Sequence, residues 1–141
     1  MEPYETDDEE RGFGCNPQEV SMWIDAINED LGKPNRVGHL LDVGHARNNG
    51  SISQQFPISK WYRIMGNKAV AYHIHQVVPM DNKLTNHRAI EDWLGPVICY
   101  ASYFYAWREN ILNHAPIFLE VRGCENYEKS IQAFERTFGV K

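Results

Sequence analysis

Three short apolar runs, each carrying acidic or histidine side chains at its end, constrain the fold of this chain more than any other feature. The run at 37–45 ends with Asp42 and His45, the run at 69–76 with His73 and His75, and the run at 115–121 with Glu120. Apolar runs of this length are typical of buried strands. In α/β proteins the functional groups lie at the carboxyl edge of a parallel sheet. We therefore expect these side chains to meet at one edge.

Amphipathic segments lie between the runs and predict helices. Asn16 and Pro17 begin the first, whose buried face is predicted to contain Val20, Trp23, Ile24, Ile27 and Leu31. Pro57 begins the second, whose buried stripe contains Ile58, Trp61, Tyr62 and Met65, with Gly66 as its C-terminal cap. A third helix is predicted to start near Pro96 and a fourth to span 126–138, whereas 77–89 is predicted to be a long loop.

This order of helix, strand, helix, strand, helix, strand, helix indicates parallel strands joined by crossovers, with the helices outside. With 141 residues, 43% of them apolar, the chain is long enough for one domain with a hydrophobic core. We expect a single domain over residues 1–141, in which the acidic residues 1–14 form a loop or arm. The pattern leaves open whether the sheet is open or part of a barrel.

The composition limits the compartment and the partners. No window approaches the roughly 18 consecutive apolar residues of a membrane span, and the N-terminus is acidic where a secretory signal is basic. Cys15, Cys99 and Cys124 are odd in number and form no CxxC pair, as expected of reduced thiols. We predict a cytoplasmic protein with no membrane contact. A net charge of −5 argues against a nucleic-acid partner.

Three segments carry a resemblance to a known family. HLLDVGHARNNG at 39–50, AYHIHQV at 71–77 followed by Asn86-His87, and IFLEVRG at 117–123 resemble the last strands of the xylose isomerase-like TIM-barrel superfamily. That superfamily includes sugar phosphate isomerases and epimerases and endonuclease IV. A complete barrel has eight strands and about 250 residues. The resemblance therefore implies an α/β partial (half) TIM barrel with three to four parallel strands and outer helices.

The resemblance also implies a metal site. Asp42, His75 and Glu120 correspond to the family's ligands of a divalent metal ion, with Glu2 as a possible fourth. His45 resembles the histidine beside the substrate in epimerases, or a ligand of a second metal ion in the nucleases. The catalytic candidates are Glu120, Glu2 and His45, and the substrate-binding candidates are His45, His73, His87 and Arg122. Asp, His and Glu side chains suit Mn, Zn, Co or Mg.

The implied chemistry is proton transfer next to the carbonyl of a small sugar or sugar phosphate, which needs an acid, a base and an electrophile. By analogy with the epimerases, Glu120 and Glu2 would exchange the proton on opposite faces of the sugar. Strands one to four are missing, and Thr85-Asn86-His87 lacks the acid of the family's zinc nucleases. The alternatives are an endonuclease IV-like phosphodiesterase and a catalytically silent half-barrel that binds a ligand or partner.

Several of these residues also have a purely structural interpretation. An acid at a strand end commonly caps the following helix or loop, because its carboxylate accepts hydrogen bonds from the N–H groups there, and this is the structural interpretation of Asp42. We interpret His39 as a strand histidine with a structural hydrogen bond, and Trp61 as part of a core stripe before a sugar platform. A half-barrel leaves strand edges and apolar side chains uncovered. We therefore expect a two-fold homodimer whose interface contains Leu40, Val70, Phe118 and the helix over 97–104.

Overall fold

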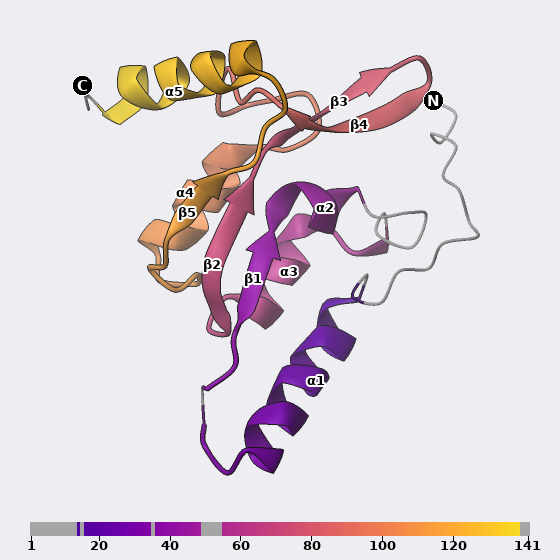
Figure 1. Cartoon of the computed structure of the whole chain (residues 1–141), viewed down its shortest axis with the longest axis vertical. Coiled ribbons are helices and arrows are strands. Elements are labelled where there is room, and N and C mark those ends of the chain that lie inside the picture. The colour runs from indigo at the N-terminus through magenta and orange to yellow at the C-terminus, as the bar shows by residue number, and fades with distance from the viewer. Residues whose placement is uncertain (1–13, 15, 35, 49–54, 139–141) are drawn as a thin grey trace.

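A three-stranded parallel sheet forms the centre of the computed structural model, which describes residues 14, 16–34, 36–48 and 55–138 (Figure 1). Glu2, and with it most of the acidic arm, lies outside the described residues. The elements in chain order are α1 (Pro17–Asp30), β1 (His39–Asp42), α2 (Val43–Arg47), α3 (Ile58–Met65), β2 (Ala69–Ile74), β3 (Gln76–Met80), β4 (Lys83–Arg88), α4 (Tyr100–Arg108), β5 (Ile117–Leu119) and α5 (Cys124–Phe138).

The strands of this sheet lie in the order β1-β2-β5, and both pairs are parallel. They coincide with the three apolar runs, so the α/β class and the parallel strands predicted from the sequence are confirmed. Helix α3 lies between β1 and β2 in the chain, and α4 lies between β2 and β5. Within the described residues the sheet does not close into a barrel, and β1 and β5 are its two edges. The half-barrel therefore remains a proposal.

One face of the sheet forms the core. Leu41 pairs with Tyr72 in register, and both side chains are fully buried. Helices α3 and α4 cover this face, as Figure 1 shows, and Tyr103 of α4 meets the Tyr72 ring edge-on with ring centroids 5.4 Å apart. The opposite face carries Leu40 and Phe118, which are 43% and 52% exposed. The two faces of one sheet thus have very different surroundings.

The prediction of a loop over 77–89 is wrong. Strands β3 and β4 form an antiparallel hairpin with Met80 opposite Lys83. Its two-residue turn is Asp81-Asn82, and both residues have positive φ, 48° and 62°. Asp and Asn tolerate this left-handed backbone better than other non-glycine residues, and two such residues suit the tight turn of a hairpin. The hairpin extends away from the carboxyl end of β2 (Figure 1).

The helices agree with the sequence in their positions but less well in their buried faces. Asn16 caps α1 as predicted, because its side chain accepts from the Gln18 N–H at 3.0 Å. Only the first turns of α1 pack, so Val20 and Ile24 are buried while Ile27 is 46% exposed. Trp23 and Leu31, also predicted to be buried, are 42% and 45% exposed.

Helix α4 begins at Tyr100 and not near Pro96, because an isolated bridge between Leu94 and Cys99 holds the preceding residues in a turn. Helix α3 has the buried stripe that the sequence predicts, with Gly66 as its C-cap. Among the residues that the structure describes, no helix has the length and apolar character needed to cross a bilayer.

We predict that Leu41→Ala lowers the free energy of unfolding by about 2–5 kcal/mol, because it leaves a cavity between the sheet and its helices. Leu94, which is 76% exposed, provides a matched control. Leu94→Ala should change the same free energy by less than about 0.5 kcal/mol. Urea denaturation followed by circular dichroism measures both values. Equal effects of the two substitutions would contradict the assignment of the core face.

Candidate metal centre

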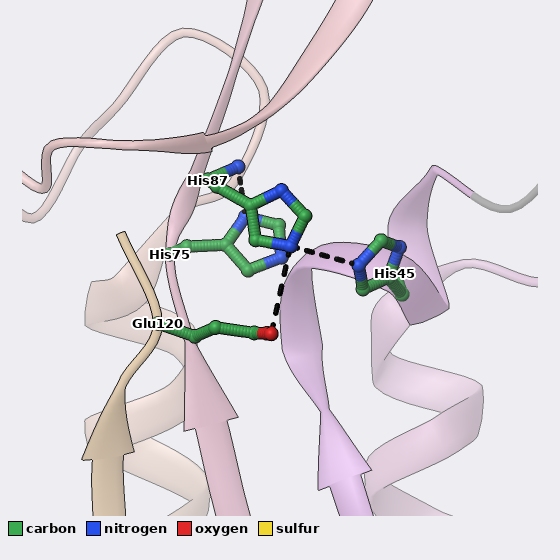
Figure 2. Close-up of side chains that lie close together, drawn as sticks. All are labelled: His45, His75, His87 and Glu120. Carbon is green, nitrogen blue, oxygen red and sulfur yellow. Dashed lines mark hydrogen bonds and ion pairs between the residues drawn. The ribbon is translucent and has the colours of Figure 1, made fainter. Parts of the chain in front are cut away.

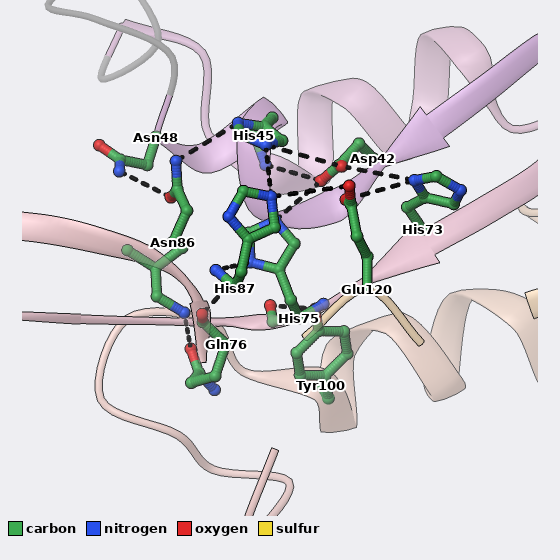
Figure 3. A network of polar contacts seen from close by, with 11 residues as sticks. Asp42, His45, Asn48, His73, His75, Gln76, Asn86, His87, Tyr100 and Glu120 are labelled. Carbon is green, nitrogen blue, oxygen red and sulfur yellow. Dashed lines mark hydrogen bonds and ion pairs between the residues drawn. The ribbon is translucent and has the colours of Figure 1, made fainter. Parts of the chain in front are cut away.

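The carboxyl edge of the sheet gathers six acidic and histidine side chains (Figures 2 and 3). They come from the end of β1, from α2, from the end of β2, from β4 and from the residue after β5, and they are Asp42, His45, His73, His75, His87 and Glu120. The parallel register explains this convergence, because Asp42 pairs with His73 and His73 pairs with Phe118, two residues before Glu120.

Asp42 has a structural role as well as a place at this edge. Its Oδ1 accepts a hydrogen bond of 2.8 Å from the His45 backbone N–H, so the carboxylate caps the five-residue helix α2. Burial acts to raise the pKa of the Asp42 carboxyl, but the neighbouring His75 ring and the His45 N–H outweigh it and hold that pKa well below its ordinary value. Asp42 is therefore an anion that His75 and His45 stabilise.

The first group of possible ligands contains His45, His75, His87 and Glu120, whose nitrogen or oxygen atoms lie within 4.8 Å of one another. The Nε2 atoms of His45 and His87 are 3.2 Å apart, and His87 Nε2 lies 3.6 Å from Glu120 Oε1. Figure 2 shows the His87 ring between the other two side chains. Three imidazoles and one carboxylate form a donor set typical of zinc and related ions.

The second group contains Asp42, His73 and Glu120. His73 Nδ1 lies 3.3 Å from Glu120 Oε2 and 3.9 Å from Asp42 Oδ2. Glu120 belongs to both groups and directs one oxygen toward His87 and the other toward His73. The predicted ligands Asp42, His75 and Glu120 thus lie in one cluster, but His75 falls in the first group and Asp42 in the second.

Buried contacts from outside the cluster hold His75 in place. The Tyr100 hydroxyl donates to the His75 carbonyl at 2.7 Å and accepts from its N–H at 3.0 Å (Figure 3). The His87 backbone N–H donates to His75 Nδ1 at 2.9 Å, and the two rings stack with centroids 4.6 Å apart. His87 makes this contact with a φ of 60°, a strained value for a histidine. The hairpin therefore positions both rings.

Two buried atoms of the cluster are left without a hydrogen-bond partner in the described part of the chain. They are His75 Nε2, which lies 3.3 Å from Asp42 Oδ1, and Glu120 Oε2. Both atoms face another possible ligand of the cluster, because Glu120 Oε2 also lies 3.3 Å from His73 Nδ1. Ligand atoms 2.0–2.1 Å from a tetrahedral ion lie about 3.3 Å from one another. The donors present and their spacing therefore fit a divalent metal ion.

His87 and Arg122 were predicted to bind substrate, and the structure places His87 among the possible metal ligands. Burial lowers the pKa of the His87 imidazole, and the nearby His75, His45 and Arg122 lower it further. A neutral imidazole is the form that binds metal ions. Arg122 itself is exposed, and its backbone N–H donates to the His87 carbonyl at 2.9 Å.

Sequence reasoning missed the amide side chains around the cluster. Asn86 Nδ2 lies 3.3 Å from His45 Nδ1, and Asn48 Nδ2 donates to Asn86 Oδ1 at 2.8 Å (Figure 3). The Gln76 side chain donates to the Ile98 carbonyl at 3.0 Å and accepts from the Ile98 N–H at 3.0 Å, which anchors the start of β3. Asn48 and Asn86 lie in predicted loops and Gln76 at the end of a predicted strand, and their local sequence gave no sign of these contacts.

Comparison with protein-family models, with curated proteins and with solved structures finds no match to this chain. The resemblance to the xylose isomerase-like superfamily stays a prediction, and the cluster has to be interpreted from its own geometry.

Gly44 offers a way to disturb His75 without removing a ligand. Its Cα lies against the His75 ring, and an added Cβ would overlap ring atoms. We predict that Gly44→Ala displaces the ring and weakens divalent-metal binding about ten- to hundred-fold, the usual effect of disturbing groups that orient ligands. Competition with a chromogenic chelator measures this affinity.

Ala46→Gly, in the same short helix, serves as the control because Ala46 belongs to neither group of possible ligands. It should leave the metal affinity unchanged apart from any loss of stability. Wild-type metal affinity in Gly44→Ala, with unchanged NMR signals from the His75 ring, would contradict the role given to His75.

Proposed function

We propose that this chain binds a divalent metal ion at the carboxyl edge of its sheet and catalyses proton transfer next to the carbonyl of a small sugar or sugar phosphate. The observation that carries the proposal is the convergence of Asp42, four histidines and Glu120, with two buried atoms that lack a partner. We include the half-barrel architecture and the cytoplasmic location in this proposal, because both rest on the sequence alone.

The donor types guide the choice of metal ion. The histidine-rich first group favours Zn, Co or Mn, whereas the second group, with two carboxylates and one histidine, also suits Mg. A bound divalent ion would polarise the carbonyl and the neighbouring hydroxyl of the substrate. In addition, its positive charge would satisfy His75 Nε2 and Glu120 Oε2 without further hydrogen bonds.

The chain's own residues would then move the proton. The Glu120 side chain is 40% exposed and has one oxygen on each side of the cluster, so a substrate can reach it from the open face. The His45 ring is equally exposed and stands at the rim, where it can donate or accept a proton. His73 and Arg122 are placed to hold hydroxyl or phosphate groups. Glu2, the second predicted acid/base, lies outside the described residues.

One observation favours a second candidate, an endonuclease IV-like phosphodiesterase. His87 belongs to the first group of possible ligands, although the acid that accompanies this histidine in the zinc nucleases is absent. A set of three histidines is suited to holding a metal ion that activates a water molecule. The net charge of −5 still disfavours a DNA substrate. A half-barrel that binds a partner without catalysis is the third possibility, and it predicts no metal-dependent activity.

We predict that the purified protein binds divalent metal and that Glu120→Gln weakens this binding at least about ten-fold, because a carboxylate shared by both groups is replaced by a neutral amide. Glu128→Gln, on the exposed surface of α5, is the matched control and should bind metal like the wild type. Elemental analysis after dialysis measures the metal content. Negligible metal in all three proteins would contradict the proposal.

A second experiment tests the chemistry. With Mn or Zn added, the protein should exchange a carbon-bound proton of a small ketose for deuterium in D₂O, since the exchange reports proton transfer next to a carbonyl. Proton NMR follows the exchange, and Glu120→Gln should reduce it at least about a hundred-fold. Cleavage of DNA with abasic sites, without exchange of any ketose, would favour the second candidate instead.

We also propose a homodimer as the working form. The sheet residues predicted for its interface are exposed, but α4, which contains part of the predicted helix over 97–104, packs against the opposite face. The interface therefore involves the open face and the edges of the sheet.

A further inference from the structure

The open face of the sheet carries an apolar row that leads to the candidate metal centre. Leu40 and Phe118 are 43% and 52% exposed, and Phe118 pairs in register with His73. At the end of the row the side chains of His73 and Glu120 are 31% and 40% exposed. Among the described residues none covers the row, and these two side chains lie at the partly exposed end of the cluster.

Helix α1 extends the apolar surface past the edge of the sheet. Ile27 and Leu31 continue the face that buries Val20 and Ile24, yet they are 46% and 45% exposed. Figure 1 shows α1 on the far side of β1 from β2. The helix thus presents apolar side chains beside the edge strand β1. A further strand paired with β1 would cover these side chains.

Both edges of the sheet are unpaired within the described residues, because β1 and β5 each pair only with β2. If the two sheets curve around a two-fold axis parallel to the strands, β5 of a second copy lies beside β1, and β1 of that copy lies beside β5. All strands would remain parallel, and one operation would satisfy both edges. This self-complementarity is what a two-fold interface requires, and it favours a second copy over an unrelated partner.

We propose that a second copy of this chain covers this surface, with its β5 edge beside β1 and next to the apolar face of α1. The exposed apolar side chains of Ile27, Leu31, Leu40 and Phe118 contribute on the order of 300 Å² at roughly 80 Å² each, and the two unpaired strand edges add backbone surface to this area. The second copy also closes the exposed side of the metal centre, a consequence that rests on the proposed function.

Light scattering after size-exclusion chromatography tests the assembly. At micromolar concentration the full chain should have twice its 16.4 kDa mass. Leu40→Asp and Phe118→Asp should each weaken the dimer about ten-fold or more, as expected for central interface residues. Leu94→Asp, on an exposed turn away from the sheet, should leave the mass unchanged. A wild-type monomer of 16.4 kDa would overturn the inference.

Disulfide cross-linking tests the orientation in a background where Cys15, Cys99 and Cys124 are replaced by serine. A mixture of Leu40→Cys and Phe118→Cys proteins should form a cross-linked dimer much faster than either protein alone, because the two positions meet only between different edges. Faster cross-linking of Phe118→Cys with itself would overturn the proposed orientation. Both experiments work without metal, so a dimer that binds no ion would contradict the proposed function and still support this inference.

Discussion

The parallel pairing of β1, β2 and β5 determines both the buried core and the position of the candidate metal centre. Because all three strands point the same way, residues that are distant in the chain leave the sheet at one edge, and Asp42, His73 and Glu120 become neighbours. The fully buried side chains of Leu41, Tyr72 and Ile74 hold this register against α3 and α4. A slip by one residue would exchange the core face and the open face, so the apolar core and the cluster depend on the same pairing.

Electrostatic contacts and hydrogen bonds hold the side chains of the cluster in place. Asp42 is held as an anion by the histidine next to it and by the helix that it caps. His75 is fully buried between Tyr100 and Gly44, and its Nε2 has no hydrogen-bond partner among the described residues. A bound cation would join the nitrogen and oxygen atoms that converge at this edge, and their convergence is the reason we favour a metal centre over a purely structural network.

The sequence predicted the strands and the Asn16 cap because apolar runs and capping residues act locally. It missed the β3–β4 hairpin because the Asp81-Asn82 turn is a weak signal and the pairing of Gln76 with Arg88 is a long-range event. That hairpin carries His87 into the cluster, so the ligand set was incomplete. His75 was the predicted ligand and His73 a substrate-binding candidate, but β2 ends at Ile74, the alternation of faces stops there, and both rings belong to groups of possible ligands. The exposure of Ile27 and Leu31 depends on which element packs beside the end of α1, and local periodicity does not reveal that element.

A crystal structure of the protein grown with Zn²⁺ or Mn²⁺, with anomalous scattering recorded at the absorption edge of the metal, tests whether this edge of the sheet is a divalent-metal centre. We expect an anomalous peak bonded to Glu120 and to histidine nitrogens of the same cluster, at about 2.0–2.2 Å. A metal-free cluster under these conditions, with His75 Nε2 and Glu120 Oε2 hydrogen-bonded to water or to neighbouring side chains, would rule out the metal centre.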